Sequence, residues 1–175
     1  MSTAVEVVSA FAAGRAADAS GLVFEYMAAT IAETSGRAAP SRVSELPGVL
    51  KDECGSLAAV YRHPGTLLVA YVGGQPAGCV GLAWRGGQTG EVKRLYVRSA
   101  HRGAGIARDL MARVHGHAAG QGLTRLVLDV LPSRVHAIGF YRRLGYTQTE
   151  PFESTSPLPM IYLARAVGPA DIRLS

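Results

Sequence analysis

A basic, glycine-rich segment, residues 91–107, carries the residue types best suited to binding a ligand. It reads Glu-Val-Lys-Arg-Leu-Tyr-Val-Arg-Ser-Ala-His-Arg-Gly-Ala-Gly-Ile-Ala, which predicts a strand, a tight turn and the first turn of a helix. The first N–H groups of a helix have no partner within it and lie at the positive end of its dipole, so they favour a phosphate group. Gly103 and Gly105 permit close approach of the backbone to a ligand, and Arg98, Arg102 and Arg108 add positive charge.

The spacing of this turn excludes two common nucleotide-binding motifs. A dinucleotide motif, Gly-x-Gly-x-x-Gly, would need glycine at position 108, which is arginine, and no P-loop sequence occurs in the chain. What does occur is Arg102-x-x-Gly105-x-Ala107, directly after a predicted strand that ends at Val97. This pattern resembles motif A of the GNAT superfamily, the acyl-CoA-dependent N-acyltransferases.

A second segment, residues 137–146, resembles the other hallmark of that superfamily. The hallmark is a helix with alanine four residues before a tyrosine, followed by three residues, a glycine and an aromatic residue. Here these positions are Ala137, Tyr141, Gly145 and Tyr146. The two motifs stand in the expected order, separated by a predicted helix and strand, and the resemblance covers roughly Thr66 to Arg165.

The resemblance implies a fold and a set of ligand contacts. It implies an α/β fold with a GNAT-like mixed, mostly antiparallel central sheet flanked by about four helices, in one N-acetyltransferase domain over residues 1–175. It implies acetyl-CoA as co-substrate, with the pantetheine between residues 95–97 and 126–130. The thioester carbonyl is then expected at backbone N–H groups of Leu95, Tyr96 and Val97. The pyrophosphate is expected at Arg102, Gly103, Ala104, Gly105, Ile106, Ala107 and Arg108.

Transfer of an acyl group to an amine needs a base, and Glu91 is the candidate. Deprotonating an alkyl amine with a pKa near 10.4 costs about 4 to 5 kcal/mol at pH 7, and a carboxylate that takes the proton is the usual remedy. Glu91 lies eleven residues before Arg102, where some members of the superfamily carry such a glutamate. The alternative is a carboxylate paired with a neighbouring Lys or Arg. Strand alternation predicts Glu91, Lys93, Leu95 and Val97 on one face and Val92, Arg94 and Tyr96 on the other.

Tyr141 is the candidate general acid, by its match to the superfamily's tyrosine, whose hydroxyl lies near the thioester sulfur. The alternative is a core residue, because Ala137, Phe140, Tyr141 and Leu144 recur at the spacing of a buried helix face. One position departs from the family pattern. Seven residues before Tyr141, where many relatives carry Asn, this chain has Arg134, which leaves that ligand contact open.

The remaining pattern predicts the elements that must position these residues. Hydrophobic periodicity and turn residues predict strands at residues 5–10, 66–72, 77–84, 91–97, 125–130, 146–152 and 160–164. The same signals predict helices at residues 16–33, 49–61, 105–119 and 133–144, the last capped by Ser133.

Composition narrows the class of protein. A chain of 175 residues with 48% hydrophobic residues is of a size for one domain. The net charge of +5 with 7% aromatic residues and no Lys/Arg-rich block does not favour nucleic acid, and an anionic small ligand explains the charge equally well. No run is long enough for a membrane span, and the acidic start predicts no secretory signal. Cys54 and Cys79 are read as reduced thiols, which favours the cytoplasm.

We therefore expect an N-acetyltransferase that moves an acetyl group from acetyl-CoA to a primary amine by direct attack in a ternary complex. The alternative is a catalytically weak acyl-CoA-binding regulatory protein of the same fold. The acceptor, a small-molecule or protein amine, is not readable; in the superfamily it is set by regions equivalent to residues 34–50 and 153–160. No metal site is expected, since His115 and His117 face different ways on one helix. A homodimer is common among similar proteins and stays open here.

Overall fold

The computed structural model describes residues 4–12, 14–153 and 156–174. These residues form a seven-stranded sheet in the order β1-β2-β3-β4-β5-β7-β6, in which β4 and β5 are parallel and every other neighbouring pair is antiparallel. The expected α/β class with a mixed, mostly antiparallel sheet is confirmed. The strands are β1 Val5–Ser9, β2 Thr66–Val72, β3 Gln75–Trp84, β4 Thr89–Val97, β5 Arg125–Val130, β6 Thr147–Gln148 and β7 Ile161–Ala166.

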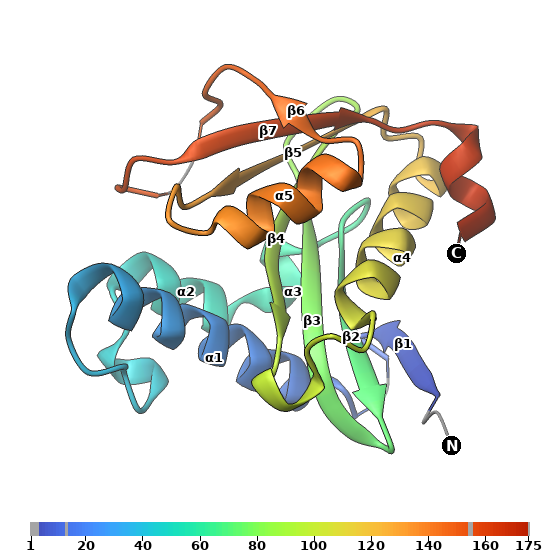
Figure 1. The fold of residues 1–175 in the computed structure, drawn as a ribbon. Helices are drawn as coiled ribbons and strands as arrows, with labels where there is room; N and C mark the ends of the chain where they lie inside the picture. Colours follow the sequence, from blue (N-terminus) through green and yellow to red (C-terminus); the bar gives the residue numbers. More distant parts are fainter. Residues whose placement is uncertain (1–3, 13, 154–155, 175) are drawn as a thin grey trace.

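Helices cover both faces of the sheet (Figure 1). The α-helices of the described residues are α1 Ala16–Ser35, α2 Gly48–Gly55, α3 Leu57–Val60, α4 Ile106–Gly120 and α5 Val135–Arg143, with short 3₁₀ turns at Val43–Glu45, Ser99–His101 and Pro169–Leu174. Residues of α4 and α5 share one hydrophobic cluster with the sheet, and residues of α1 and α3 share another. We call these two sides of the sheet the α4 face and the α1 face.

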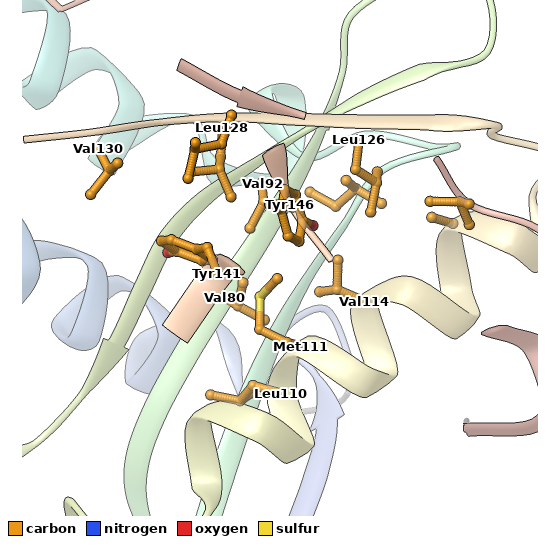
Figure 2. Packing of buried hydrophobic residues seen from close by; sticks show 14 of the residues in the cluster. Val80, Val92, Leu110, Met111, Val114, Leu126, Leu128, Val130, Tyr141 and Tyr146 are labelled. Atoms are coloured by element: carbon orange, nitrogen blue, oxygen red, sulfur yellow. The ribbon is translucent and has the colours of Figure 1, made fainter. Parts of the chain in front are cut away.

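The core on the α4 face follows from the two periodicities of the chain. Leu110, Met111 and Val114 recur at helical spacing along α4 and are fully buried. They pack on alternate residues of the strands, among them Val80 and Val92, as Figure 2 shows. Burying a side chain of this size contributes about 1.5–3 kcal/mol, so this cluster fixes α4, and with it the turn that begins the helix, against the sheet.

The α1 face holds a second core around a buried tyrosine. Tyr61, directly after α3, is 1% exposed. Its ring lies so close to Gly81 of β3 that a Cβ added there would stand 2.2 Å from Tyr61 Cε1. Glycine is therefore required at position 81 to let Tyr61 pack flat on the strand, and alanine there would displace the tyrosine.

Most of the predicted elements are confirmed, and the exceptions have local causes. Residues 49–61, expected as one helix, are divided into α2 and α3 at Ser56, whose φ of −137° is not helical. Ser133 does not cap α5: Arg134 is the N-cap residue, without a side-chain cap bond, and the Ser133 hydroxyl instead donates to Glu33 at 2.9 Å.

Strand β4 contains a β-bulge, which sequence alternation did not predict. Lys93 and Tyr96 pair with residues of β3 that are two positions apart, so Arg94 and Leu95 together stand opposite one residue. Arg94 takes up the extra length with a φ of +57°, the only positive φ among the described residues other than glycine. This left-handed conformation is unfavourable for a residue with a side chain, so contacts of Arg94 elsewhere must hold it in place.

The bulge exchanges the faces of the residues that follow it. Leu95 and Val97 lie with Val92 on the α4 face, whereas Tyr96 packs in the cluster of the α1 face. The prediction that Leu95 and Val97 share a face with Glu91 was wrong. Alternation assumes that each residue of one strand stands opposite one residue of its neighbour. A bulge inserts an extra residue, so the residues after it point to the face opposite to the one that alternation predicts.

Candidate active site

The parallel strands β4 and β5 separate halfway along their length. Their pairing ends at Glu91 and Val127, although β4 continues to Val97 and β5 to Val130. Figure 1 shows the two strands running in different directions past this point. Beyond this point the backbone edges of β4 and β5 do not pair with each other, and we call the separation between them the opening. It lies between the two segments where the resemblance places the pantetheine.

The glycine-rich turn before α4 presents unpaired amides. Gly103 and Gly105 have φ of +81° and +84°, which glycine adopts without strain. Gly105 is the N-cap residue of α4, and the N–H groups of Arg108 and Asp109 already donate to its carbonyl. Within the described part of the chain, no hydrogen bond is donated by the main-chain N–H groups of Gly103, Ala104, Gly105, Ile106 and Ala107.

The arginines around this turn are not equivalent. Arg98 forms a two-bond ion pair with Glu25, at 2.6 and 3.0 Å, and also donates to the Pro76 carbonyl. Its charge is therefore used inside the protein, which corrects the expectation that Arg98 serves the turn. Arg102 and Arg108 are exposed, and neither has a carboxylate partner among the described residues.

Glu91 is buried on the α1 face, at the last position of β4 that pairs with β5. Its side chain is 2% exposed, with Arg85 Nε at 3.5 Å and Lys93 Nζ at 3.6 Å from its carboxylate oxygens. Burial raises the pKa of Glu91, and the charges of Lys93 and Arg85 offset that rise only in part. The cationic neighbours that the alternative interpretation expects are present, and the carboxylate is nevertheless a stronger base than an exposed glutamate.

A second buried acid, Glu53 of α2, lies on the same face, and sequence reasoning missed it. Arg94 donates to both Glu53 oxygens, at 2.9 and 2.7 Å, and the Tyr61 hydroxyl donates to one of them at 2.7 Å. Burial by itself would raise the pKa of Glu53, but the bonds and charge of Arg94 reverse this and hold it below the ordinary value. The two-bond pair thus fixes Arg94 in the bulge and leaves Glu91 as the carboxylate on this face with the raised pKa.

Tyr141 lies at the edge of the core. It is 9% exposed, packs in the α4-face cluster, and its ring lies 5.8 Å from that of Tyr146 (Figure 2). Burial raises the pKa of Tyr141, and the neighbouring Tyr26 contributes to the rise, while Arg134 opposes it. The phenol therefore keeps its proton at neutral pH, and the core stripe predicted from the spacing is present as well.

Arg134 joins the start of α5 to α1. Its guanidinium donates to Glu33 at 2.8 and 3.1 Å, to the Tyr26 hydroxyl at 3.1 Å and to Thr30 Oγ1 at 2.7 Å. These bonds occupy the donors of the side chain that replaces the family's usual asparagine. Arg134 therefore links the N-terminus of α5 to α1.

His115 and His117 each contact other groups of the protein. His115 is buried, with Nε2 3.0 Å from the Tyr146 hydroxyl and Nδ1 2.6 Å from Arg165, and His117 bonds the Pro64 carbonyl. No group of three or more potential metal-ligand residues exists in the described ranges.

None of the helices in the described ranges has the length and apolarity to cross a bilayer. Cys54 and Cys79 are free thiols, and burial raises the pKa of Cys79 to about 12.

Comparison with known proteins identifies the family. A profile of the Acetyltransferase (GNAT) family matches residues 31–146, which is more than half of the chain. The chain therefore belongs to the GNAT acetyltransferase family, and acetyl transfer is the activity that this family and its curated members share.

Individual relatives are similar over about half to nearly all of the chain. An IAA acetyltransferase of Azospirillum brasilense is 36% identical over 95 residues, which are 53% of this chain and 61% of that protein. The chain thus covers less than two thirds of that relative. A crystal structure of a GNAT-family acetyltransferase from Staphylococcus aureus has a TM-score of 0.72 at 15% identity, over 93% of this chain and 99% of the other. A Bacillus subtilis acetyltransferase crystallised with CoA has a TM-score of 0.54 at 18% identity, over 63% and 82%.

Proposed function

We propose that residues 1–175 act as one N-acetyltransferase domain that transfers an acetyl group from acetyl-CoA to a primary amine by direct attack in a ternary complex. The observation that carries the proposal is the opening between β4 and β5 next to a helix N-terminus with five unpaired amides. An extended thiol arm fits an opening between unpaired strand edges, and a pyrophosphate fits the free amides and the positive end of α4.

The proposed ligand contacts divide the co-substrate into two parts. The pyrophosphate binds the turn, with Arg102 and Arg108 as flanking charges; its contacts are the amides of Gly103, Ala104, Gly105, Ile106 and Ala107. The pantetheine binds along the unpaired edge of β4, where Leu95, Tyr96 and Val97 present backbone groups. Oriented donors of this kind can stabilise the oxyanion that forms on a thioester carbonyl.

Glu91 is proposed as the general base and Tyr141 as the general acid. The amine nitrogen bonds to the acetyl carbon, its proton passes to Glu91 directly or through water, and the carbon–sulfur bond breaks. Tyr141 gives its proton to the leaving sulfur and is reprotonated from solvent, and Glu91 releases the amine proton to solvent. The raised pKa of Glu91 supports its part, because a base is most effective when its pKa approaches the working pH.

A covalent cysteine intermediate receives no support from the residues present. Cys79 is fully buried in the α1-face cluster, and its raised pKa leaves it a neutral thiol. Cys54 also has a pKa raised by burial, and its sulfur lies against the Met27 sulfur at 3.6 Å. A nucleophilic cysteine needs the opposite, a lowered pKa and access to the substrate.

The first test is binding of acetyl-CoA. At a concentration of one hundred times Kd, acetyl-CoA should add about 2.7 kcal/mol to the free energy of unfolding, seen as a rise in melting temperature. Arg108→Gln should weaken binding about tenfold, while Arg113→Gln, which removes an exposed arginine further along the same helix, should not. Equal binding by the two variants would argue against the turn as the phosphate site.

The second test separates an enzyme from a regulatory binder of the same fold. Release of free CoA thiol is followed with a panel of primary amines and compared with the rate in their absence. Thiol release that depends on the amine supports transfer. Binding of acetyl-CoA without such release favours the regulatory alternative.

A further inference from the structure

An open pocket of about 530 Å³ lies on the α1 face next to Glu91. Its lining includes Thr89, on the same face of β4 as Glu91, and Val127, the pairing partner of Glu91 on β5. A smaller hollow of about 390 Å³ contains Glu91 itself and shares Arg62, Trp84 and Arg85 with the larger one. A molecule in the pocket therefore lies beside the proposed base, on the side of the sheet opposite to α4.

The wall of this pocket is rich in guanidinium groups. Arg62, Arg85 and Arg125 line it, and Glu153 is the acidic residue of its described lining. Arg85 is engaged, since it lies beside the Glu91 carboxylate and donates to the Glu153 carbonyl. Arg62 and Arg125 form no ion pair within the described ranges, although Arg125 donates one hydrogen bond to Thr149 Oγ1 at 3.1 Å. Two arginines with donors to spare in one pocket are suited to a planar anion such as a carboxylate.

Aromatic rings form the other part of the wall. Trp84 is 39% exposed, and its indole N–H donates to the Gly87 carbonyl at 3.0 Å, which fixes the ring orientation. Phe152 packs edge-on against Tyr162, with ring centroids 5.2 Å apart. The Arg62 guanidinium lies 5.9 Å from the Trp84 ring. The pocket thus offers held apolar surfaces beside its positive charge, in the size range of a small-molecule site.

These features disfavour a polycationic acceptor. A polyamine, or an amine within a basic peptide, would bring further positive charge against three guanidinium groups. An amine that also carries a carboxylate brings the opposite charge, and that carboxylate can be held while the nitrogen faces Glu91.

We propose that the acceptor is a small, amino-acid-like amine, whose carboxylate binds Arg62 and Arg125 and whose apolar side chain packs on Trp84 and Phe152. This inference rests on the transferase function proposed above, because it assigns the acceptor of the same site. Arg62 and Arg125 then determine specificity by binding the acceptor's charge, while Glu91 handles its proton.

The binding test does not require turnover. N-acetyl-phenylalanine, which resembles a product, and its uncharged amide are titrated by calorimetry without acetyl-CoA. We expect the acid to bind at least tenfold more tightly. Arg62→Gln and Arg125→Gln should each weaken the acid about tenfold and leave the amide unchanged, and Arg113→Gln on the opposite face serves as the matched control. Equal affinity for acid and amide, or arginine variants that match the control, would overturn the assignment.

Turnover separates failure of this inference from failure of the transferase function. Phenylalanine, phenylalaninamide and spermidine are compared as acceptors by kcat/KM, and phenylalanine should be preferred. A preference for spermidine or for the amide overturns the acidic acceptor while transfer itself stands. If none of the three amines causes thiol release but the acid still binds more tightly than the amide, the transferase function is refuted and the anion site stands. Arg62 and Arg125 are exposed, so melting temperatures near that of the wild type are expected for both variants.

Discussion

The ion pair between Glu53 and Arg94 offers the sharpest test of how the bulge of strand β4 is held in place. The two side chains are 8% and 14% exposed and share two hydrogen bonds. Glu53→Gln keeps the shape and one acceptor but leaves the Arg94 charge buried without its partner. Breaking such a pair from one side costs about 3–5 kcal/mol, and we take about 3 because Gln retains a hydrogen bond.

This loss converts to a measurable shift in melting temperature. For a domain of this size, 1 kcal/mol corresponds to about 2–4 °C, so Glu53→Gln should melt about 6–12 °C below the wild type at pH 7.5. Glu45→Gln is the matched control, because Glu45 pairs with Arg42 at the surface and exposed pairs contribute little. A shift for Glu53→Gln no larger than that of Glu45→Gln would refute the account of the bulge.

The pH dependence gives the same prediction an independent check. Because Arg94 holds the folded pKa of Glu53 below its ordinary value of 4.5, the pair stabilises the fold fully above that value and is lost as pH falls through the lower folded pKa. The gap in the free energy of unfolding between the wild type and Glu53→Gln should therefore stay constant from about pH 8 to 5 and narrow only below that range. A gap that closes already at neutral pH would contradict this assignment.

Three further substitutions test the remaining assignments. Glu91→Gln should lower kcat at least tenfold and abolish the acidic limb of the rate profile, which in the wild type should lie above the ordinary carboxylate value because burial raises the pKa of Glu91; an unchanged profile removes Glu91 from the mechanism. Tyr141→Phe should slow turnover at unchanged melting temperature, and normal turnover would leave Tyr141 a core residue only. The folded pKa of His115 is lowered by burial from 6.5 to about 4, so the unfolded chain takes up the proton first and the wild type should lose about 3 kcal/mol as pH falls from 6.5 to 4. Urea titrations of His115→Gln should lack this loss, and an equal pH slope would contradict it.

The proposed acceptor pocket illustrates what a family resemblance leaves undetermined. The resemblance placed acceptor selection at residues 34–50 and 153–160, of which residues 154–155 lie outside the described ranges. The described lining takes only Val49 and Glu153 from those regions. Most of the wall comes from Arg62, the β3–β4 hairpin and β5. The sequence alone does not indicate that Arg62, Arg85 and Arg125 line one pocket. The three residues lie in different segments, and the residues around each of them follow a different pattern.

What the sequence by itself determined is local. The glycines before α4, the apolar run of β5 and the periodicity of α4 each act over a few residues, through backbone freedom and side-chain spacing. They were sufficient to predict those elements, the turn with unpaired amides and the family.

Only the tertiary structure decided the contacts between distant segments. Glu53 meets Arg94 across 41 positions and Glu33 meets Arg134 across 101, and the first of these holds the bulge that sets which residues face the opening. Such pairs form because packing of helices on the sheet brings them together and excludes water, and neither charge pattern nor periodicity along the chain encodes that proximity.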